Sequence, residues 1–128
     1  MDESDLIEIP GLVHVIVDDP SVRNSLAFLF EANGFQTLSY ESAGEFLRAD
    51  PSPAGCIILA YETPNDDGLA SLALIRSKRG SLPVIMLAGM LNPDSRAVAR
   101  EQGVSAIFET PLSEAELIAA VGNLSSSA

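Results

Sequence analysis

Short runs of apolar residues alternate with longer segments of mixed polarity from residue 12 to residue 124. Most of the runs are rich in β-branched side chains and are flanked by Asp, Asn, Gly or Pro, which is the pattern of short strands. We predict five strands, at residues 12–17, 35–40, 56–60, 83–88 and 104–108. Because 12–17 and 56–60 are apolar almost throughout rather than alternating, the pattern is typical of parallel strands covered on both faces.

Each predicted strand is followed by a segment with helix signals. The first segment begins at Asp19-Pro20, an N-cap residue followed by a proline suited to the first helical position, and ends at Asn33-Gly34. Its apolar stripe at helical spacing is Val22, Leu26, Leu29 and Phe30. The later signals are the capping box Ser42/Glu45, the spacing of Leu69, Leu72 and Ile75, the pair Asn92-Pro93, and the capping box Ser113/Glu116 with the stripe Leu117, Val121 and Leu124.

The alternation of strand and helix predicts an α/β fold, namely a flavodoxin-like, doubly wound (βα)5 domain with a five-stranded parallel sheet. The expected boundaries are an acidic N-terminal tail at residues 1–10, the domain at residues 11–124, and a C-terminal tail or the start of a linker at residues 125–128. In such sheets ligands bind beyond the carboxyl ends of the strands, near the point where the strand order reverses. We therefore expect function to depend on the residues at the strand ends.

Composition narrows the possible functions. The 128 residues carry a formal net charge of −11, which disfavours direct contact with nucleic acid or with anionic membranes. The single cysteine, Cys56, excludes an internal disulfide, and the single histidine, His14, leaves no Cys/His metal cluster. We expect a cytoplasmic protein, because the acidic N-terminus is unlike a secretory signal and no apolar run is long enough to span a membrane.

Several motifs at the strand ends occur in an order that resembles a known family. They are residues 17–27, Gly34-Phe35, Pro64 with Gly68, Leu87-Ala88-Gly89, and Gly103 leading to Glu109-Thr110-Pro111. Together they resemble the receiver domain of two-component response regulators over residues 12–124. They are most similar to the branch whose members often carry a C-terminal helix-turn-helix. The resemblance implies a signalling domain and not an enzyme.

The chemistry of that family uses an acidic pair that holds Mg²⁺, an Asp that accepts the phosphoryl group, a Ser or Thr hydroxyl, and a Lys; an aromatic residue acts as a switch. The resemblance places Val17 and Asp18 at the acidic pair, Ala60 at the phosphoacceptor, Ala88 at the hydroxyl, Thr110 at the lysine and Ile107 at the aromatic switch. Of these residues only Asp18 retains the required chemistry. Loss of the lysine alone would leave a cluster of mutually repelling acids, whereas loss of the lysine together with the carboxylates avoids this repulsion. The positions predict a degenerate phosphorylation site without a cofactor.

Two functions from different classes remain open. The first is an atypical receiver that is not phosphorylated on the usual Asp and acts by protein–protein interaction. For this function the resemblance implies a histidine kinase, a phosphotransfer protein or an output domain as partner, with transcription regulation as the output. It also implies a possible homodimer through the fourth helix, the fifth strand and the fifth helix. The alternative is a small-molecule sensor that uses the apolar crevice near Ala60 and Ala88.

Some residues have both a structural and a functional interpretation. Asp18 and Glu62 are weak candidates for a metal site, because so few carboxylates are a poor ligand set for Mg²⁺. The same two carboxylates could form a catalytic pair, but the sequence offers no further catalytic group beside them. Asp19 is better explained as an N-cap, His14 as a buried structural histidine and Cys56 as a core residue. The candidates for a partner interface are Phe28, on the side of the first helix opposite its apolar stripe, and Met90 and Leu91, in a turn where polar residues are usual.

Overall fold

The computed structural model describes residues 12–49, 55–60, 62–63, 66–78, 82–89 and 91–125. The elements in chain order are β1 (Leu12–Ile16), α2 (Pro20–Ala32), β2 (Gln36–Tyr40), α3 (Ala43–Arg48), β3 (Cys56–Ala60), β4 (Glu62–Thr63), β5 (Asp66–Asp67), α4 (Gly68–Lys78), β6 (Val84–Ala88), α5 (Pro93–Glu101), β7 (Ala106–Glu109) and α6 (Glu114–Ser125). The predicted acidic tail at residues 1–10 and Met90 lie outside the described residues, as do residues 126–128. Helix α6 includes Ser125, so it continues one residue past the predicted end of the domain.

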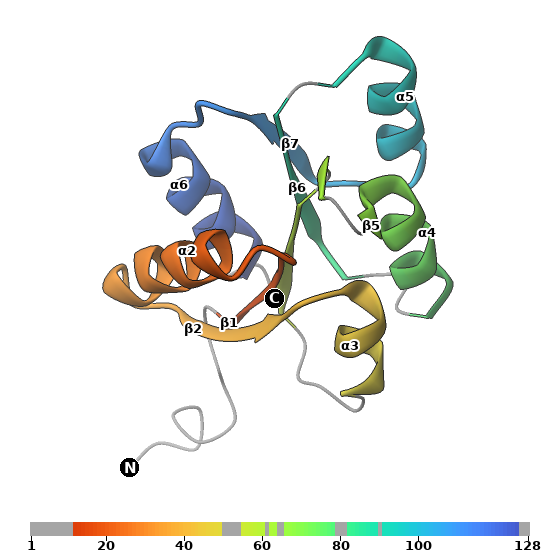
Figure 1. Cartoon of the computed structure of the whole chain (residues 1–128). Coiled ribbons are helices and arrows are strands. Elements are labelled where there is room, and N and C mark those ends of the chain that lie inside the picture. Colours follow the sequence, from red (N-terminus) through yellow and green to blue (C-terminus); the bar gives the residue numbers. More distant parts are fainter. Residues whose placement is uncertain are drawn as a thin grey trace.

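One parallel sheet in the order β2-β1-β3-β6-β7 forms the centre of the domain (Figure 1). From β1 the chain moves to one edge to form β2, and it then returns to add β3, β6 and β7 on the other side. The strand order therefore reverses between β1 and β3. This is the doubly wound, five-stranded arrangement that the alternation of strand and helix predicts, so the fold class is confirmed.

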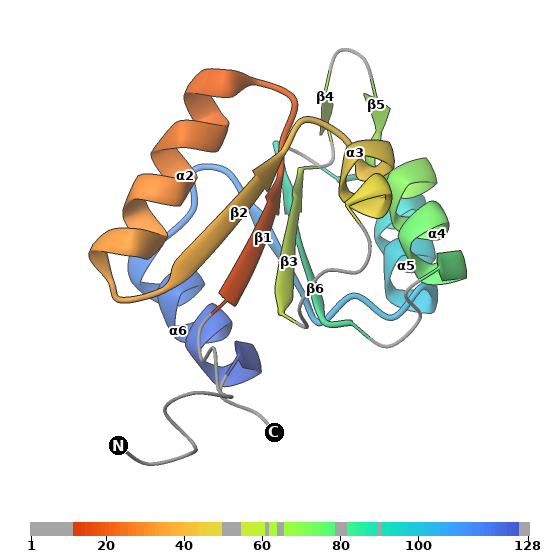
Figure 2. The ribbon, with the colours of Figure 1, turned by 90° about the horizontal axis from the view of Figure 1, so that it is seen from below.

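Helices cover both faces of the sheet, with α2 and α6 on one face and α3, α4 and α5 on the other (Figures 1 and 2). Each face has its own core: Ile58 and Phe30 belong to the core under α2 and α6, whereas Ile57 and Phe46 belong to the core under α3, α4 and α5. Adjacent strand residues enter different cores because successive side chains point to opposite faces. Among the helices that the structure describes, none combines the length and apolar character needed to cross a membrane.

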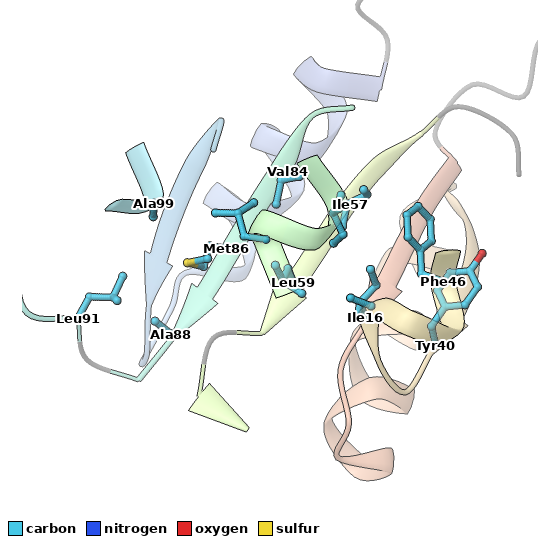
Figure 3. Packing of buried hydrophobic residues seen from close by; sticks show 13 residues of the cluster. Ile16, Tyr40, Phe46, Ile57, Leu59, Val84, Met86, Ala88, Leu91 and Ala99 are labelled. Atoms are coloured by element: carbon cyan, nitrogen blue, oxygen red, sulfur yellow. The ribbon is translucent and has the colours of Figure 1, made fainter. Parts of the chain in front are cut away.

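The core under α3, α4 and α5 contains a buried aromatic group (Figure 3). His14 is fully buried, and its Nδ1 lies 3.2 Å from the hydroxyl of Tyr40. The rings of Tyr40 and Phe46, which Figure 3 shows beside Ile16, meet edge to face with centroids 5.2 Å apart. His14 packs against Phe46 in the same manner, at 5.0 Å. The prediction of a structural histidine is confirmed.

The predicted N-cap residues cap their helices, although Glu45 of the predicted capping box accepts a hydrogen bond from the N–H of Glu41, at 3.4 Å, instead of from Ser42. The carboxylate of Asp19 accepts hydrogen bonds from the N–H groups of Ser21 and Val22, at 2.8 and 3.3 Å, and so caps α2. Ser42, Asn92 and Ser113 each accept a hydrogen bond from the N–H three residues later, at 3.1, 2.8 and 3.2 Å respectively. Gly34 and Gly103 follow α2 and α5 with φ angles of +92° and +78°, a region that favours glycine. These caps fix where each helix begins and ends relative to the sheet.

The structure corrects some details of the prediction. Two short strands, β4 and β5, which the sequence pattern does not predict, follow β3 and pair antiparallel; each is too short to give a periodic signal. The fifth strand of the sheet, predicted at residues 104–108, runs from Ala106 to Glu109. Val22, predicted in the buried stripe of α2, is 46% exposed, because the first turn of this helix borders a crevice instead of the sheet.

Candidate functional site

Residues at the carboxyl ends of β1, β3 and β6 surround a pocket of about 280 Å³. The residues that line it are Val17, Val22, Leu26, Ala60, Leu87, Ala88, Gly89, Thr110 and Leu112. The pocket lies where the strand order reverses, which is where doubly wound sheets bind their ligands. Among these described lining residues there is no acidic, basic or histidine side chain, and Thr110 supplies the polar one. The site is therefore an apolar pocket, which we call the strand-end pocket.

Four of the six positions singled out in the sequence meet in the strand-end pocket: Val17, Ala60, Ala88 and Thr110. Backbone hydrogen bonds hold two of them beyond the ends of their strands. The N–H of Val17 donates to the carbonyl of Tyr40 at 3.1 Å, and the N–H of Thr110 donates to the carbonyl of Ala88 at 2.9 Å. The walls that these two residues form are therefore fixed by the sheet itself.

Asp18 is not among the residues that line the pocket. Its backbone carbonyl accepts a hydrogen bond from Nη1 of Arg23 at 3.3 Å, and the carbonyl of Val17 accepts one from the same nitrogen at 2.7 Å. Nη2 of Arg23 also lies 4.0 Å from Oε1 of Glu41. Arg23 thus fixes the turn between β1 and α2 through backbone carbonyls.

The donor set at this edge of the sheet does not fit the Mg²⁺ ion that receiver chemistry uses. A hard cation of this kind needs several oxygen ligands, and the strand-end pocket presents methyl groups instead. Within the described residues, no group of three or more His, Cys, Asp or Glu side chains lies close enough to hold a metal ion. Glu62 begins β4, but its side chain lies outside what the structure describes.

Glu109, the last residue of β7, links the edge of the pocket to helix α5. Its Oε1 pairs with Nη2 of Arg96, and its Oε2 accepts a hydrogen bond from the N–H of Leu91 at 3.2 Å. The N–H of Leu91 and the guanidinium of Arg96 hold the pKa of Glu109 below its usual value of 4.5. We call this arrangement the Arg96–Glu109 clamp. Because Thr110 follows Glu109 directly, the clamp lies next to the strand-end pocket.

Ile107, at the position expected for an aromatic switch, is partly buried against the core under α3, α4 and α5. The adjacent Phe108 packs against the core on the opposite face of the sheet. Phe108 therefore cannot replace an aromatic side chain at Ile107, because the two residues point in opposite directions. This orientation is the one expected from strand geometry.

The three candidate interface residues have different placements. Phe28, on α2, is 75% exposed. Leu91 does not have the exposure predicted for an interface residue: it is 8% exposed, because it packs in the core under α3, α4 and α5. Figure 3 shows Leu91 with Ala88 and Ala99 at the β6 side of that core. Met90 lies outside the described residues.

Sequence reasoning missed the Arg96–Glu109 clamp and the part played by Leu112. Arg96 and Glu109 are 13 residues apart, and they approach each other only when α5 packs beside β7. Leu112 lines both the strand-end pocket and a neighbouring groove between α2 and α6. The role of Leu112 could have been predicted from its position, because it follows Pro111 and the end of β7, and loops at strand ends commonly line ligand sites.

The sheet order and the strand-end pocket define this chain as a doubly wound α/β domain of the flavodoxin-like class. A family model described as the response regulator receiver domain matches residues 13–122. The chain belongs to this family and is a receiver domain of two-component response regulators. Receiver domains are in general signalling domains without enzymatic activity, and they interact with kinases and output domains.

Relatives of the chain include transcriptional regulators. It is 36% identical over 110 residues to the transcriptional regulatory protein FixJ of Azorhizobium caulinodans, covering 85% of this chain and 52% of that protein. The chain thus spans about half the length of this relative. Its structure is similar to the receiver domain of the Francisella response regulator 1452, with a TM-score of 0.80 at 25% identity, over 91% of this chain and 97% of that one. It is also similar to full-length FixJ from B. japonicum, with a TM-score of 0.79 at 26% identity, over 89% and 57%.

Proposed function

We propose that this receiver domain is not phosphorylated at the position usual in its family and that it signals through protein contacts. The observation that carries the proposal is the residue at the end of β3, Ala60, whose methyl group borders the strand-end pocket. By the motifs described above, Ala60 stands at the phosphoacceptor position. Val17, Ala88 and Thr110 stand at positions of the acidic pair, the hydroxyl and the lysine, and all of them line the same pocket. Their meeting in one pocket supports this correspondence of positions.

The chemistry of phosphoryl transfer supports the same proposal. Phosphorylation of a receiver forms a bond between phosphorus and a carboxylate oxygen and breaks the bond to the donor. The methyl group of Ala60 has no oxygen to form such a bond. Asp18 alone is a poor ligand set for Mg²⁺, and Thr110 carries no charge to neutralise a phosphoryl group.

The proposed output surface is the face formed by α5, β7 and α6, through which a second copy of the chain or an output domain would bind. The Arg96–Glu109 clamp joins α5 to β7 on this face. If the domain is not phosphorylated, its partner must recognise one fixed arrangement of α5, β7 and α6. The clamp favours such an arrangement, because it joins α5 to β7. The relative FixJ is named a transcriptional regulatory protein. We therefore propose that this chain also regulates transcription, through an output domain that is either attached to it or part of a partner.

A histidine kinase or a phosphotransfer protein is the proposed partner at α2, which covers the same face of the sheet as α6 (Figures 1 and 2). Phe28 offers a large apolar side chain that is 75% exposed on this helix. We expect Phe28→Ala to weaken binding to the helical bundle of such a partner. The matched control is Leu38→Ala, which removes an apolar side chain that is 42% exposed on β2. Equal binding by both variants and the unchanged chain would count against α2 as the docking helix.

A second candidate function is small-molecule sensing. The observation that favours it is the apolar lining of the strand-end pocket, since ligand pockets are concave and mostly apolar with few polar groups. In this function a ligand, and not a phosphoryl group, would bias the output surface. The two candidates share the absence of phosphorylation and differ in what occupies the pocket.

Incubation with Mg²⁺ and acetyl phosphate, followed by intact mass measurement, tests the proposal. We expect no covalent phosphoryl adduct on the unchanged chain. The variant Val17→Asp, Ala60→Asp, Ala88→Thr, Thr110→Lys should acquire one adduct, because it restores the carboxylates, the hydroxyl and the amine. The matched control keeps Ala60 and carries the other three substitutions, and it should acquire none. A stoichiometric adduct on the unchanged chain would overturn the proposal.

A further inference from the structure

The size of the strand-end pocket indicates what it can hold. Its volume is about 280 Å³. A dry protein cavity of about 150 Å³ accommodates one benzene molecule, so this pocket has room for one substituted ring or two fused rings. That volume is larger than a single apolar side chain from a protein partner would need. The pocket is also built in advance, because the backbone hydrogen bonds of Val17 and Thr110 hold two of its walls.

The lining of the pocket limits the charge of an occupant. Among the described residues that line it, the side chains are aliphatic, apart from the hydroxyl of Thr110 at an exposed position. A charged group placed here would lose its hydration without gaining a partner, which is costly. The occupant must therefore be uncharged in the part that enters the pocket.

A groove of about 340 Å³ between α2 and α6 continues from the pocket, with Val22, Leu26 and Leu112 lining both. Its other lining residues are Ser21, Ser25, Leu29 and Glu114. Glu114 is the charged residue among them, and it is exposed. Together with the net charge of −11, this carboxylate repels an anionic group that projects from the pocket.

We infer that the strand-end pocket binds a small, mostly apolar ring compound that is neutral or carries a cationic substituent, with its ring system among Val17, Ala60, Ala88 and Leu112. The inference rests on the second candidate function and on the proposed absence of phosphorylation. Ala60 and Ala88 have a specific role here, because longer side chains at the ends of β3 and β6 would occupy the space that the ring system needs.

The position of the pocket connects such a ligand to the output surface. Ala88 and Thr110 line the pocket and are joined by the hydrogen bond between their backbones. Glu109 precedes Thr110 as the last residue of β7. Its carboxylate pairs with Arg96 of α5 and accepts a hydrogen bond from the N–H of Leu91. A ring compound that contacts Ala88 and Thr110 therefore contacts the last residue of β6 and the residue that follows Glu109 of the Arg96–Glu109 clamp.

Indole, tryptamine and indole-3-acetate are suitable probes, because they share a two-ring system and differ in charge. The experiment is a titration of the ¹⁵N-labelled chain monitored by amide chemical shifts. We expect saturable shifts with indole and tryptamine at Val17, Ala60, Gly89 and Thr110, and binding of indole-3-acetate that is weaker by about ten-fold or more. Equally tight binding of the anion, or shifts confined to other regions, would overturn the inference.

Variants provide a second test. Ala60→Leu fills the pocket and should weaken indole binding by about ten-fold or more, whereas Ala73→Leu, at an exposed position on α4, should leave it unchanged. If Ala60→Leu does not fold, the shift map of the unchanged chain still decides the matter. If no probe binds while a partner's helical bundle shifts the pocket residues, the inference is wrong and the pocket is a protein contact. Incubation with acetyl phosphate separates the failure of this inference from the failure of the proposed function. A phosphoryl adduct on the unchanged chain would refute the proposed function. The absence of both an adduct and probe binding would refute the inference alone.

Discussion

Replacing Ala60 by aspartate tests the apolar character of the strand-end pocket directly. The new carboxylate would stand among aliphatic side chains, with no cation among the described residues that line the pocket. Such surroundings favour the protonated form, so they raise the pKa of the introduced carboxyl above its usual range. Ala60→Asp alone should therefore destabilise the domain, although it restores the residue expected at a phosphoacceptor position.

The expected cost follows from the partial burial of Ala60. Burying a polar group without a partner costs about 1–3 kcal/mol in proteins, and the charged form of a partly buried carboxyl falls in the same range. For a domain of this size, each 1 kcal/mol lowers the melting temperature by roughly 3–5 °C. Because the carboxyl has a raised pKa in the folded state, the cost should be small at low pH and grow as the pH rises through that pKa.

Urea unfolding between pH 4 and pH 8 measures this dependence. Adding Thr110→Lys should recover about half of the loss or more, because the two positions share the pocket and opposite charges favour each other there. The matched control is Ala73→Asp on the exposed side of α4, which should cost about 0.5 kcal/mol and show little dependence on pH. A cost for Ala60→Asp that is absent at pH 7, or that does not change with pH, would refute the description of the pocket as apolar.

Three further outcomes follow from contacts outside the pocket. Asp19→Ala should lower stability by about 1 kcal/mol in thermal melts, because it removes the N-cap of α2; Asp19→Asn should restore most of it, and equal stability of all three chains would refute the cap. Glu109→Gln should lower stability near pH 7 but not at low pH. The lowered pKa of Glu109 contributes stability that is present above the usual pKa of this carboxyl and is lost as the pH falls through its pKa in the folded state. Urea titration at both pH values checks the sign, and Arg96→Gln should remove part of the difference, because the N–H of Leu91 also lowers this pKa. Burial raises the pKa of the Cys56 thiol to about 12, so a disulfide reagent at pH 8 should react with the chain only after unfolding; rapid labelling of the folded chain would contradict this burial.

The strand-end pocket and the Arg96–Glu109 clamp together suggest how this domain works without a phosphoryl group. In the proposed function, Ala60, Ala88 and Thr110 lack the groups that phosphorylation needs, and they line an apolar pocket instead. The clamp, one residue from that space, joins β7 to α5. An occupant of the pocket, or a partner bound to α5, β7 and α6, would then act on the same end of β7 and on the clamp that joins it to α5.

Much of the fold could be predicted because its signals are local. The apolar runs at 12–17 and 56–60 indicated buried parallel strands, and the caps at Asp19, Ser42 and Ser113 marked helix starts that the structure has at those places. The pair β4 and β5 was missed, because strands of two residues give no period to detect. Val22 was assigned to the buried stripe, because helical spacing does not indicate where a helix extends past the sheet.

The sequence by itself determined which side chains stand at the strand ends, and hence that Ala60, Ala88 and Thr110 bring neither a carboxylate nor a cation there. Residue types and their order along a strand do not depend on what packs nearby. Only the tertiary structure decided that these residues enclose one pocket with Leu112, that Leu91 is buried, and that Glu109 pairs with Arg96. Those contacts join residues far apart in the chain, and they exist only once the parallel strands have aligned their carboxyl ends and the helices have packed against the sheet.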